Sequence, residues 1–293
     1  MPATAEPLRR LPVPVRLIAR ETIGSFLTRL AFANSLRVPH LLALTAITTD
    51  QRSFTPATDD TRGWSDSTPD RIAALADRLL AELAAAIPLL ATMTPADTAP
   101  LRACGHCTAS KNVTGMVILR ARPGDYLCLR HQQWLRGIHR PSLAALPEIT
   151  ASQRRHDRRT ANVPDQDMTR AHRQAQDITG QWLASGWHPA LTERWHGRHR
   201  RLTAVLPGPE TVLADVITHP EMLAVARLLI ASQRTPGIRP REIAARLGFP
   251  YPSRPHPLDP LQNHLSQYAA LKEAPWALTF PPGSATRTSP PAW

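Results

Sequence analysis

The sequence predicts a mainly α-helical protein in which a small β-hairpin module lies between two helical regions. Three observations predict this fold class. Apolar residues recur at the spacing of amphipathic helices in several segments, all three cysteines lie within one short stretch, and 30 prolines divide the 293 residues into short segments. The length suffices for two domains, and 13 glycines with 5% aromatic residues argue against one compact barrel.

The N-terminal region is expected to begin with an extended tail and to continue as two helices. Four prolines hold residues 1–15 extended and deny them regular hydrogen bonding. An amphipathic stripe predicts a helix from Thr22 to about Ser35, and Pro39 suits the first turn of a second short helix. This short connection is typical of a helical hairpin or a helix-turn-helix. The apolar members of the first stripe are Ile23, Phe26, Leu27, Leu30 and Ala31.

A polar loop and a further helix follow. Residues 48–68 are rich in Thr, Asp, Ser and Pro and therefore predict a loop. Thr68 suits a helix cap and Pro69 suits the first turn, so we expect one continuous helix from there to Pro88. Its apolar stripe consists of Ile72, Leu75, Ala76, Leu79, Leu80 and Leu83.

Two pairs of potential metal ligands lie in the middle of the chain. Cys104 and Cys107 form a CxxC pair, and Cys128 and His131 form a CxxH pair. A two-residue spacer lets both side chains of a pair converge from one tight turn, and a tetrahedral zinc ion needs four such ligands. The odd cysteine count argues against a closed disulfide framework and suits a reducing compartment, with the cytoplasm as the default. His106 and His139 are alternatives to His131 as the fourth ligand, but neither is separated from a cysteine by a two-residue spacer, as His131 is from Cys128.

We expect these pairs to form a zinc ribbon over residues 101–135. Short apolar segments at 116–119 and 126–127 flank a turn at 123–125, which predicts a small β-hairpin whose ends hold the ligand pairs. Four protein ligands leave no open coordination position, so the pattern favours one structural Zn²⁺ ion over a catalytic one. The plain alternative is that the cysteines are ordinary buried residues and the histidine is a surface residue.

A zinc hydrolase or deaminase is the catalytic alternative. Zinc deaminases place a His-x-Glu upstream of Pro-Cys-x-x-Cys and use that Glu to transfer protons. In this chain Ala103 precedes Cys104, and no His-x-Glu occurs before it. We therefore expect no enzymatic activity.

The chain is strongly basic. Its formal net charge of +12 favours a polyanionic partner such as double-stranded DNA, by counterion release and long-range attraction. All but two of its 35 basic residues are arginine, which codon bias alone could produce, so the position of each arginine is the better guide. Two clusters are expected to contact phosphates, with a solvated helical face as the alternative for each. The first consists of Arg154, Arg155, Arg158 and Arg159, and the second of Arg194, Arg198, Arg200 and Arg201.

Beyond the ribbon the sequence predicts a second helical region. Residues 146–206 form a basic helical segment, within which an apolar stripe ends near Gly186. Pro207 and Pro209 mark a boundary, after which two helices with apolar faces open the region 207–274. The stripe before the boundary consists of Ala171, Ala175, Ile178 and Trp182.

The end of the chain contains a possible second DNA-binding module and a tail. Residues 240–248 resemble the first helix of a helix-turn-helix, and residues 261–271 resemble a recognition helix. Five prolines lie in the connection between them, which is longer than the usual turn. Residues 275–293 are rich in Pro, Ser and Thr and predict a disordered tail.

The first helix and the ligand pairs together resemble the TniQ family. Residues 21–34, Glu-Thr-Ile-Gly-Ser-Phe-Leu-Thr-Arg-Leu-Ala-Phe-Ala-Asn, are similar to the Glu-Ser-x-x-Ser-aromatic-Leu-x-Arg-Leu-Ala helix near the start of its members. The family places a zinc finger after this helical region, and the resemblance covers residues 10–145. Family ligand pairs commonly contain Cys-Pro-x-Cys and Cys-Pro-x-His-Gly, whereas this chain has Cys-Gly-His-Cys and Cys-Leu-Arg-His-Gln. The ligands match while their neighbours differ.

This resemblance implies a non-catalytic, DNA-binding accessory protein of transposition that selects a target site and recruits the transposition machinery. The expected partners are double-stranded DNA and either transposition proteins or a guide-RNA complex, and a homodimer is a further option. No stretch approaches 18 consecutive apolar residues, so no membrane partner is expected. The alternative functions are a protein–protein interaction scaffold and a transcriptional regulator without a role in transposition.

Overall fold

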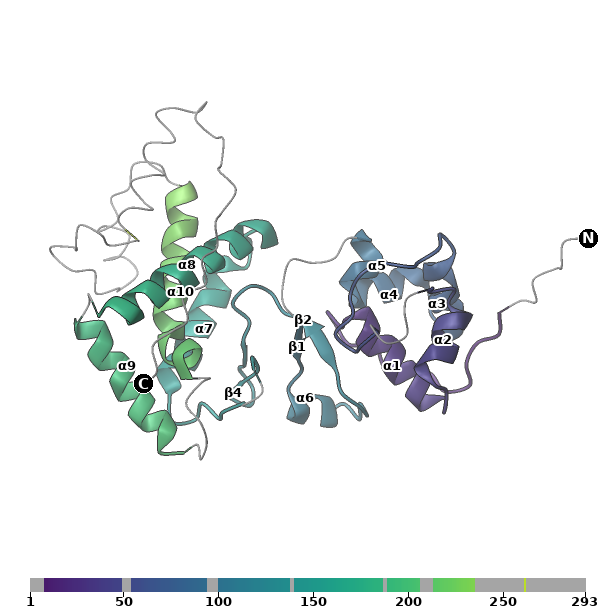
Figure 1. Ribbon diagram of the computed structural model, residues 1–293, viewed down its shortest axis with the longest axis horizontal. Helices are drawn as coiled ribbons and strands as arrows, with labels where there is room; N and C mark the ends of the chain where they lie inside the picture. Colours follow the sequence, from purple (N-terminus) through teal and green to yellow (C-terminus); the bar gives the residue numbers. More distant parts are fainter. Residues whose placement is uncertain are drawn as a thin grey trace, which may run out of the picture. The chain divides into compact units, whose positions relative to one another are not determined.

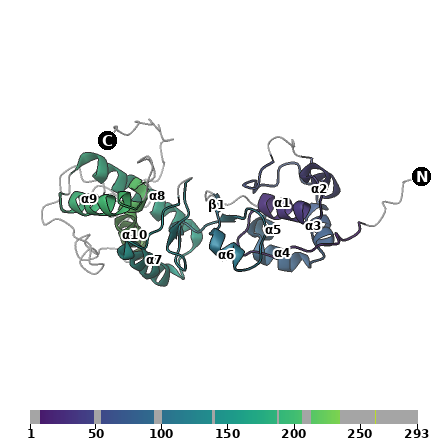
Figure 2. The ribbon, with the colours of Figure 1, turned by 90° about the horizontal axis from the view of Figure 1, so that it is seen from below.

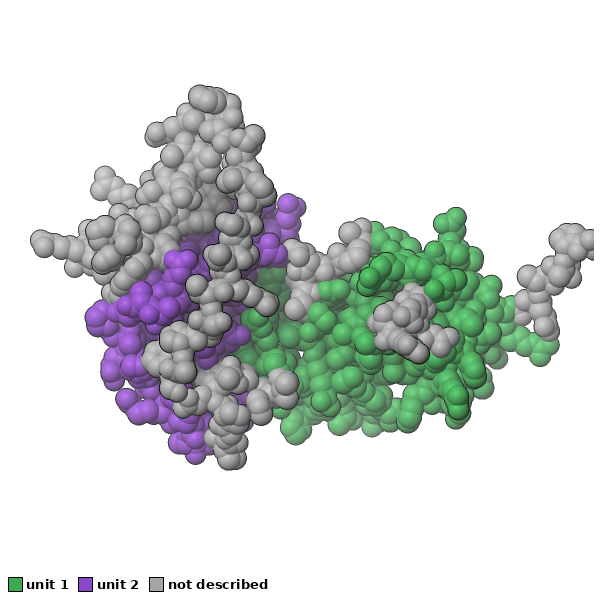
Figure 3. All heavy atoms as spheres, viewed as in Figure 1, with its two compact units in different colours: residues 1–140 green, residues 141–293 purple. Residues whose placement is uncertain are grey.

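The computed structural model describes residues 8–48, 54–93, 100–137, 140–186, 189–205, 213–234 and 261. The described part is mainly helical and contains two small antiparallel sheets, which confirms the predicted fold class. The chain divides into two compact units, residues 1–140 and residues 141–293 (Figure 3).

Short helices that share one apolar core form the first part of unit 1 (Figure 1). Helix α1 begins after Thr22, whose side chain caps it by accepting a hydrogen bond from the Ser25 amide at 3.3 Å. Its apolar stripe is buried in the core, and the extended residues before it also pack there. These helices are α1 (Ile23–Ala33), α2 (Val38–Leu44), α3 (Thr68–Ala76), α4 (Leu80–Ala86) and α5 (Pro88–Thr92).

The expected continuous helix from Thr68 to Pro88 is wrong, because the chain forms α3, α4 and α5 there instead. Asp77 ends α3 in the left-handed conformation at φ 52°, a conformation that Asp tolerates better than most residues. Leu79 is then extended and 70% exposed. An apolar stripe that continues across a break does not reveal the break.

In the described residues of unit 1, the β-structure consists of two hairpins where one was expected. Strand β1 (Pro100–Arg102) pairs with β2 (Ile118–Arg120), and β3 (Leu127–Cys128) pairs with β4 (Gln133–Trp134), both antiparallel. The short helix α6 (Gly105–Ala109) lies between β1 and β2. The expected pairing of segment 116–119 with segment 126–127 is therefore wrong, although each ligand pair does lie in a hairpin.

A buried polar network joins α1 to strand β2. The Glu21 carboxylate accepts hydrogen bonds from both Nε and Nη2 of Arg29, at 2.8 and 2.6 Å, and from the Ser25 hydroxyl at 2.7 Å. The Ser25 hydroxyl oxygen accepts from the Ile118 amide at 3.0 Å, and the Thr22 amide donates to the Ile118 carbonyl at 2.9 Å. The polar residues of segment 21–34 thus attach the ribbon to the helical core.

Unit 2 is helical in its described part. Both Figure 1 and Figure 2 show α10 beside α7, and α10 packs on α7, α8 and α9. The predicted helix end near Gly186 is confirmed, because this glycine caps α8 at φ 63°. The helices are α7 (Pro147–Thr160), α8 (Asp165–Ser185), α9 (Pro189–Thr203) and α10 (Leu213–Arg234).

The two helices expected after the boundary prolines are one helix, α10, with Pro220 inside it. A proline inside a helix removes one backbone hydrogen bond and disturbs the preceding turn. The carbonyl that loses its helical donor is that of Val216, and Arg198 of α9 donates from Nη1 to the neighbouring Ile217 carbonyl at 2.6 Å.

Several predicted segments lie outside the described residues. These are the boundary prolines, the possible helix-turn-helix at 240–248 and 261–271 apart from Leu261, and the tail at 275–293. Among the helices described above, none combines enough length with enough apolar character to traverse a lipid bilayer.

Candidate metal centre

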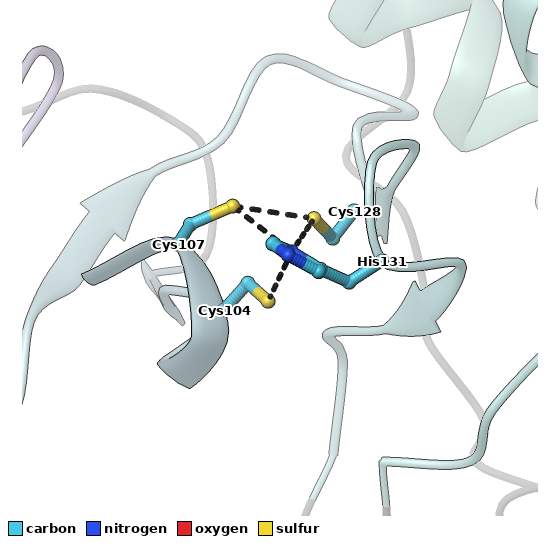
Figure 4. A group of neighbouring side chains, drawn as sticks. All are labelled: Cys104, Cys107, Cys128 and His131. Atoms are coloured by element: carbon cyan, nitrogen blue, oxygen red, sulfur yellow. Dashed lines mark hydrogen bonds between the residues drawn. The ribbon is translucent and has the colours of Figure 1, made fainter. Parts of the chain in front are cut away.

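The four predicted ligands converge from the two hairpins of the ribbon (Figure 4). Cys104 precedes the first residue of α6, and Cys107 lies one turn further along that helix. Cys128 ends β3, and His131 lies in the turn between β3 and β4. The short spacers therefore place two ligands on each hairpin, as the sequence predicts.

The distances between the ligand atoms match the edges of a metal-centred tetrahedron. The Nδ1 atom of His131 lies 3.4, 3.2 and 3.6 Å from the Sγ atoms of Cys104, Cys107 and Cys128, respectively. The Cys107 and Cys128 sulfurs are 3.6 Å apart, and all four ligand atoms lie within 4.8 Å of one another. Zinc bond lengths of about 2.3 Å to sulfur and 2.0 Å to nitrogen give tetrahedral edges of about 3.8 and 3.5 Å. The cluster can therefore hold a metal ion.

The electrostatics of the cluster also fit a cation. Burial, followed by the hydrogen bond to Cys128 and its charge, raises the pKa of the Cys107 thiol to about 12. Three thiolates cannot share this space without a positive charge, because each one opposes ionisation of the others. A bound divalent cation would reverse that balance, since metal ligation deprotonates a coordinating thiol.

Neighbouring side chains hold the two hairpins in position. Trp134 is 1% exposed and packs against the Tyr126 ring, with 5.9 Å between ring centroids. Arg140 donates from Nη1 to the Ala103 carbonyl at 3.0 Å, directly before the first cysteine. The Cys104 thiol also lies 3.4 Å from Oε1 of Gln133.

The two competing histidines have different positions. His106 lies beside the fourth ligand, with its ring centroid 5.1 Å from that of His131, but only the His131 nitrogen contacts all three sulfurs. His139 lies outside the described residues.

The first arginine cluster forms an exposed row on α7. The opposite face of this helix is buried and contains Ile149, Gln153, His156 and Thr160. Within the part of the chain that the structure describes, no arginine of the row forms an ion pair. The members of the row are Arg154, Arg155, Arg158 and Arg159.

Most members of the second arginine cluster interact with carboxylates of the protein itself. Arg198 is 7% exposed and donates to both carboxylate oxygens of Glu221, at 2.6 and 3.0 Å, so its expected role as a phosphate contact does not fit. Arg201 pairs with Glu148, and Arg200 lies 3.5 Å from the Glu193 carboxylate. Arg194, the remaining member, is exposed.

A polar cluster inside unit 2 was not predicted. His156 and His172 lie 1% and 2% exposed, with their Nε2 atoms 3.1 Å apart. Arg227 of α10 is 6% exposed, and neither Nε nor Nη1 has a hydrogen-bond partner. The available signal was a single basic residue within the apolar stretch 222–230 of the sequence.

Comparisons with protein-family models, with characterised proteins and with solved structures yield no match to this chain. The residues and their geometry are therefore the basis for assigning a function.

Proposed function

We propose that this chain is a zinc-stabilised, non-catalytic DNA-binding accessory protein, similar in role to the target-selecting TniQ proteins of transposition. The ligand set of three thiolates and one imidazole is the one that structural zinc sites use. Four protein ligands leave no coordination position for a substrate or a reactive water. The ion would fix the two hairpins, which have too few apolar residues to fold alone.

The observation that carries DNA binding is the unpaired arginine row on α7. A helical face that serves only solubility would place acidic partners three or four residues from its basic residues. In this row the one acidic residue within the stretch, Asp157, accepts a hydrogen bond from Gln153 at 2.7 Å. Exposed guanidinium groups without internal partners are free to bind phosphates.

The partners follow from this role. Double-stranded DNA would bind the arginine row through its phosphates, and transposition proteins or a guide-RNA complex would bind other surfaces of the chain. Recognition of a particular sequence requires contacts to base edges, which a row of phosphate contacts does not supply.

Titration of a fluorescent DNA duplex at several salt concentrations tests this proposal. One variant replaces the four arginines of the row by glutamine. Its control removes the same charge from exposed arginines of unit 1, namely Arg9, Arg37, Arg62 and Arg78.

We expect the row variant to bind more weakly and the slope of log Kobs against log[salt] to fall by about 3 to 4, because each neutralised phosphate contributes about 0.9. The control should keep most of the affinity. No binding of the unmodified chain at low salt, or an equal loss in both variants, would overturn the proposal. Elemental analysis of the untagged chain should find one zinc per molecule.

A further inference from the structure

Within its described residues, unit 2 contains a buried positive charge that has no ion-pair partner there. Arg227 lies on α10, which packs on α7 and α8, and it is 6% exposed. Its Nε and Nη1 atoms have no hydrogen-bond partner among the described residues. A guanidinium stays charged in proteins, and an unpaired buried charge destabilises the folded state.

Among the described residues, the charged groups that act on this guanidinium are themselves positive. Burial, followed by the charges of Arg159 and Arg155, lowers the pKa of Arg227 to about 10, which leaves the side chain protonated at neutral pH. Arg155 and Arg159 are exposed and one turn apart on α7, where like charges repel each other. Three guanidinium groups therefore lie close enough for their charges to act on one another, and none of them forms an ion pair within the described residues.

Helix α10 also contains a buried charge that does have partners. Glu221, two turns before Arg227, receives hydrogen bonds from Nη1 and Nη2 of Arg198 and from Nε1 of Trp195. Both of its carboxylate oxygens are satisfied. Among the described residues Arg227 has no such arrangement, which leaves its donors available to a ligand.

We propose that Arg227, Arg155 and Arg159 form a binding site for a phosphate group. The guanidinium group presents N–H donors in a planar fork that matches phosphate oxygens, and three of them can surround one tetrahedral anion. In such a site the buried guanidinium would contact the anion from the protein side and the two exposed ones from the solvent side. The source of the phosphate rests on the proposed function, under which it is a backbone phosphate of DNA.

The first test uses inorganic phosphate with the full-length protein. The unfolding temperature is measured in sodium phosphate and in sodium chloride at equal ionic strength, because a ligand that binds only the folded state raises it. The double variant R155Q/R159Q removes the exposed part of the site without altering the core. The control R154Q/R158Q removes the same charge from the same helix.

We expect phosphate to stabilise the unmodified chain and R154Q/R158Q, and to have little effect on R155Q/R159Q. R227M should lose the response as well. Equal unfolding temperatures of the unmodified chain in phosphate and chloride, or equal responses of the two double variants, would overturn the site. This readout does not depend on whether R227M folds.

The second test separates the two sources of phosphate by DNA titration of the same variants. We expect R155Q/R159Q to bind about tenfold more weakly than R154Q/R158Q, as the loss of charge-assisted hydrogen bonds predicts. A phosphate response without DNA binding would support the site with a free phosphate or nucleotide as ligand, and would overturn the proposed function. DNA binding without a phosphate response, with equal losses in both variants, would overturn the site and leave the proposed function standing.

Discussion

Acidification from pH 7 to pH 5 is expected to destabilise unit 2, because two buried histidines are neutral in the folded state. Burial is the main cause that lowers the pKa of His156 to about 2 and that of His172 to about 3, against an ordinary value of 6.5. The positive charge of Arg227 lowers the pKa of both, while His172 and His219 lower that of His156 further. Arg227 and His219 belong to α10, and His172 belongs to α8.

The sign and size of the effect follow from linkage. A histidine whose folded pKa is lowered stabilises the fold fully above its unfolded pKa, and this stabilisation falls as the pH drops below about 6.5. Between pH 7 and pH 5 each histidine then takes up a proton in the unfolded state only, at a cost of about 2 kcal/mol. The two together lower the free energy of unfolding by about 4 kcal/mol, a large part of the stability of a small domain.

Hydrogen exchange followed by mass spectrometry measures this effect separately in each unit. Peptides from α7, α8 and α10 should exchange faster at pH 5 after correction for the intrinsic pH dependence of exchange. The variant H172F should show about half of the pH effect, whereas H196Q, which alters an exposed histidine of α9, should keep all of it. Protection of these helices that does not change between pH 7 and pH 5 would refute the reasoning.

Three further predictions concern unit 1. Arg29→Met should lower the free energy of unfolding by about 3 to 5 kcal/mol in denaturant titrations, because it leaves a buried carboxylate unpaired; a loss below 1 kcal/mol would contradict a buried ion pair. Cys107→Ala, like chelation, should make residues 101–135 sensitive to protease, since structural zinc contributes about 10 kcal/mol to small fingers; unchanged cleavage would argue against a structural ion. Gly24→Ala should lower the thermal midpoint, because a Cβ atom there would lie 2.3 Å from the Thr55 carbonyl oxygen, and an unchanged midpoint would show that this loop yields freely.

The features that were predictable from the sequence depend on short stretches of chain. A two-residue spacer determines how two side chains converge, so the four residues that could hold a metal ion were identified without knowledge of the fold. The helix after Thr22 and the helix that ends at Gly186 combine an apolar stripe with a cap, and both were located correctly. Such local patterns predict the structure correctly where tertiary contacts favour the same conformation.

The features that were not predictable depend on tertiary contacts. Strands of two or three residues have little preference of their own, and their pairing is set by the buried network around Ser25 and by the metal ligands. The break at Asp77 interrupts an apolar pattern that continues on both sides of it. The buried network of Glu21 and Arg29 was visible only as part of a family-like motif, since charged residues are rarely buried.

The fate of each arginine follows from its position on a helix more than from the number of arginines nearby. Arg198 occupies the apolar stripe of α9, whose other members are Leu191, Trp195 and Leu202, and this spacing alone predicts a buried, paired side chain. The row on α7 lies opposite the buried face of its helix, so its guanidinium groups remain exposed and unpaired. Clusters of equal density can therefore have opposite roles, one within the fold and one toward a partner. For a basic protein of this kind, the arginines that lack internal acidic partners are the ones whose removal should change binding rather than stability.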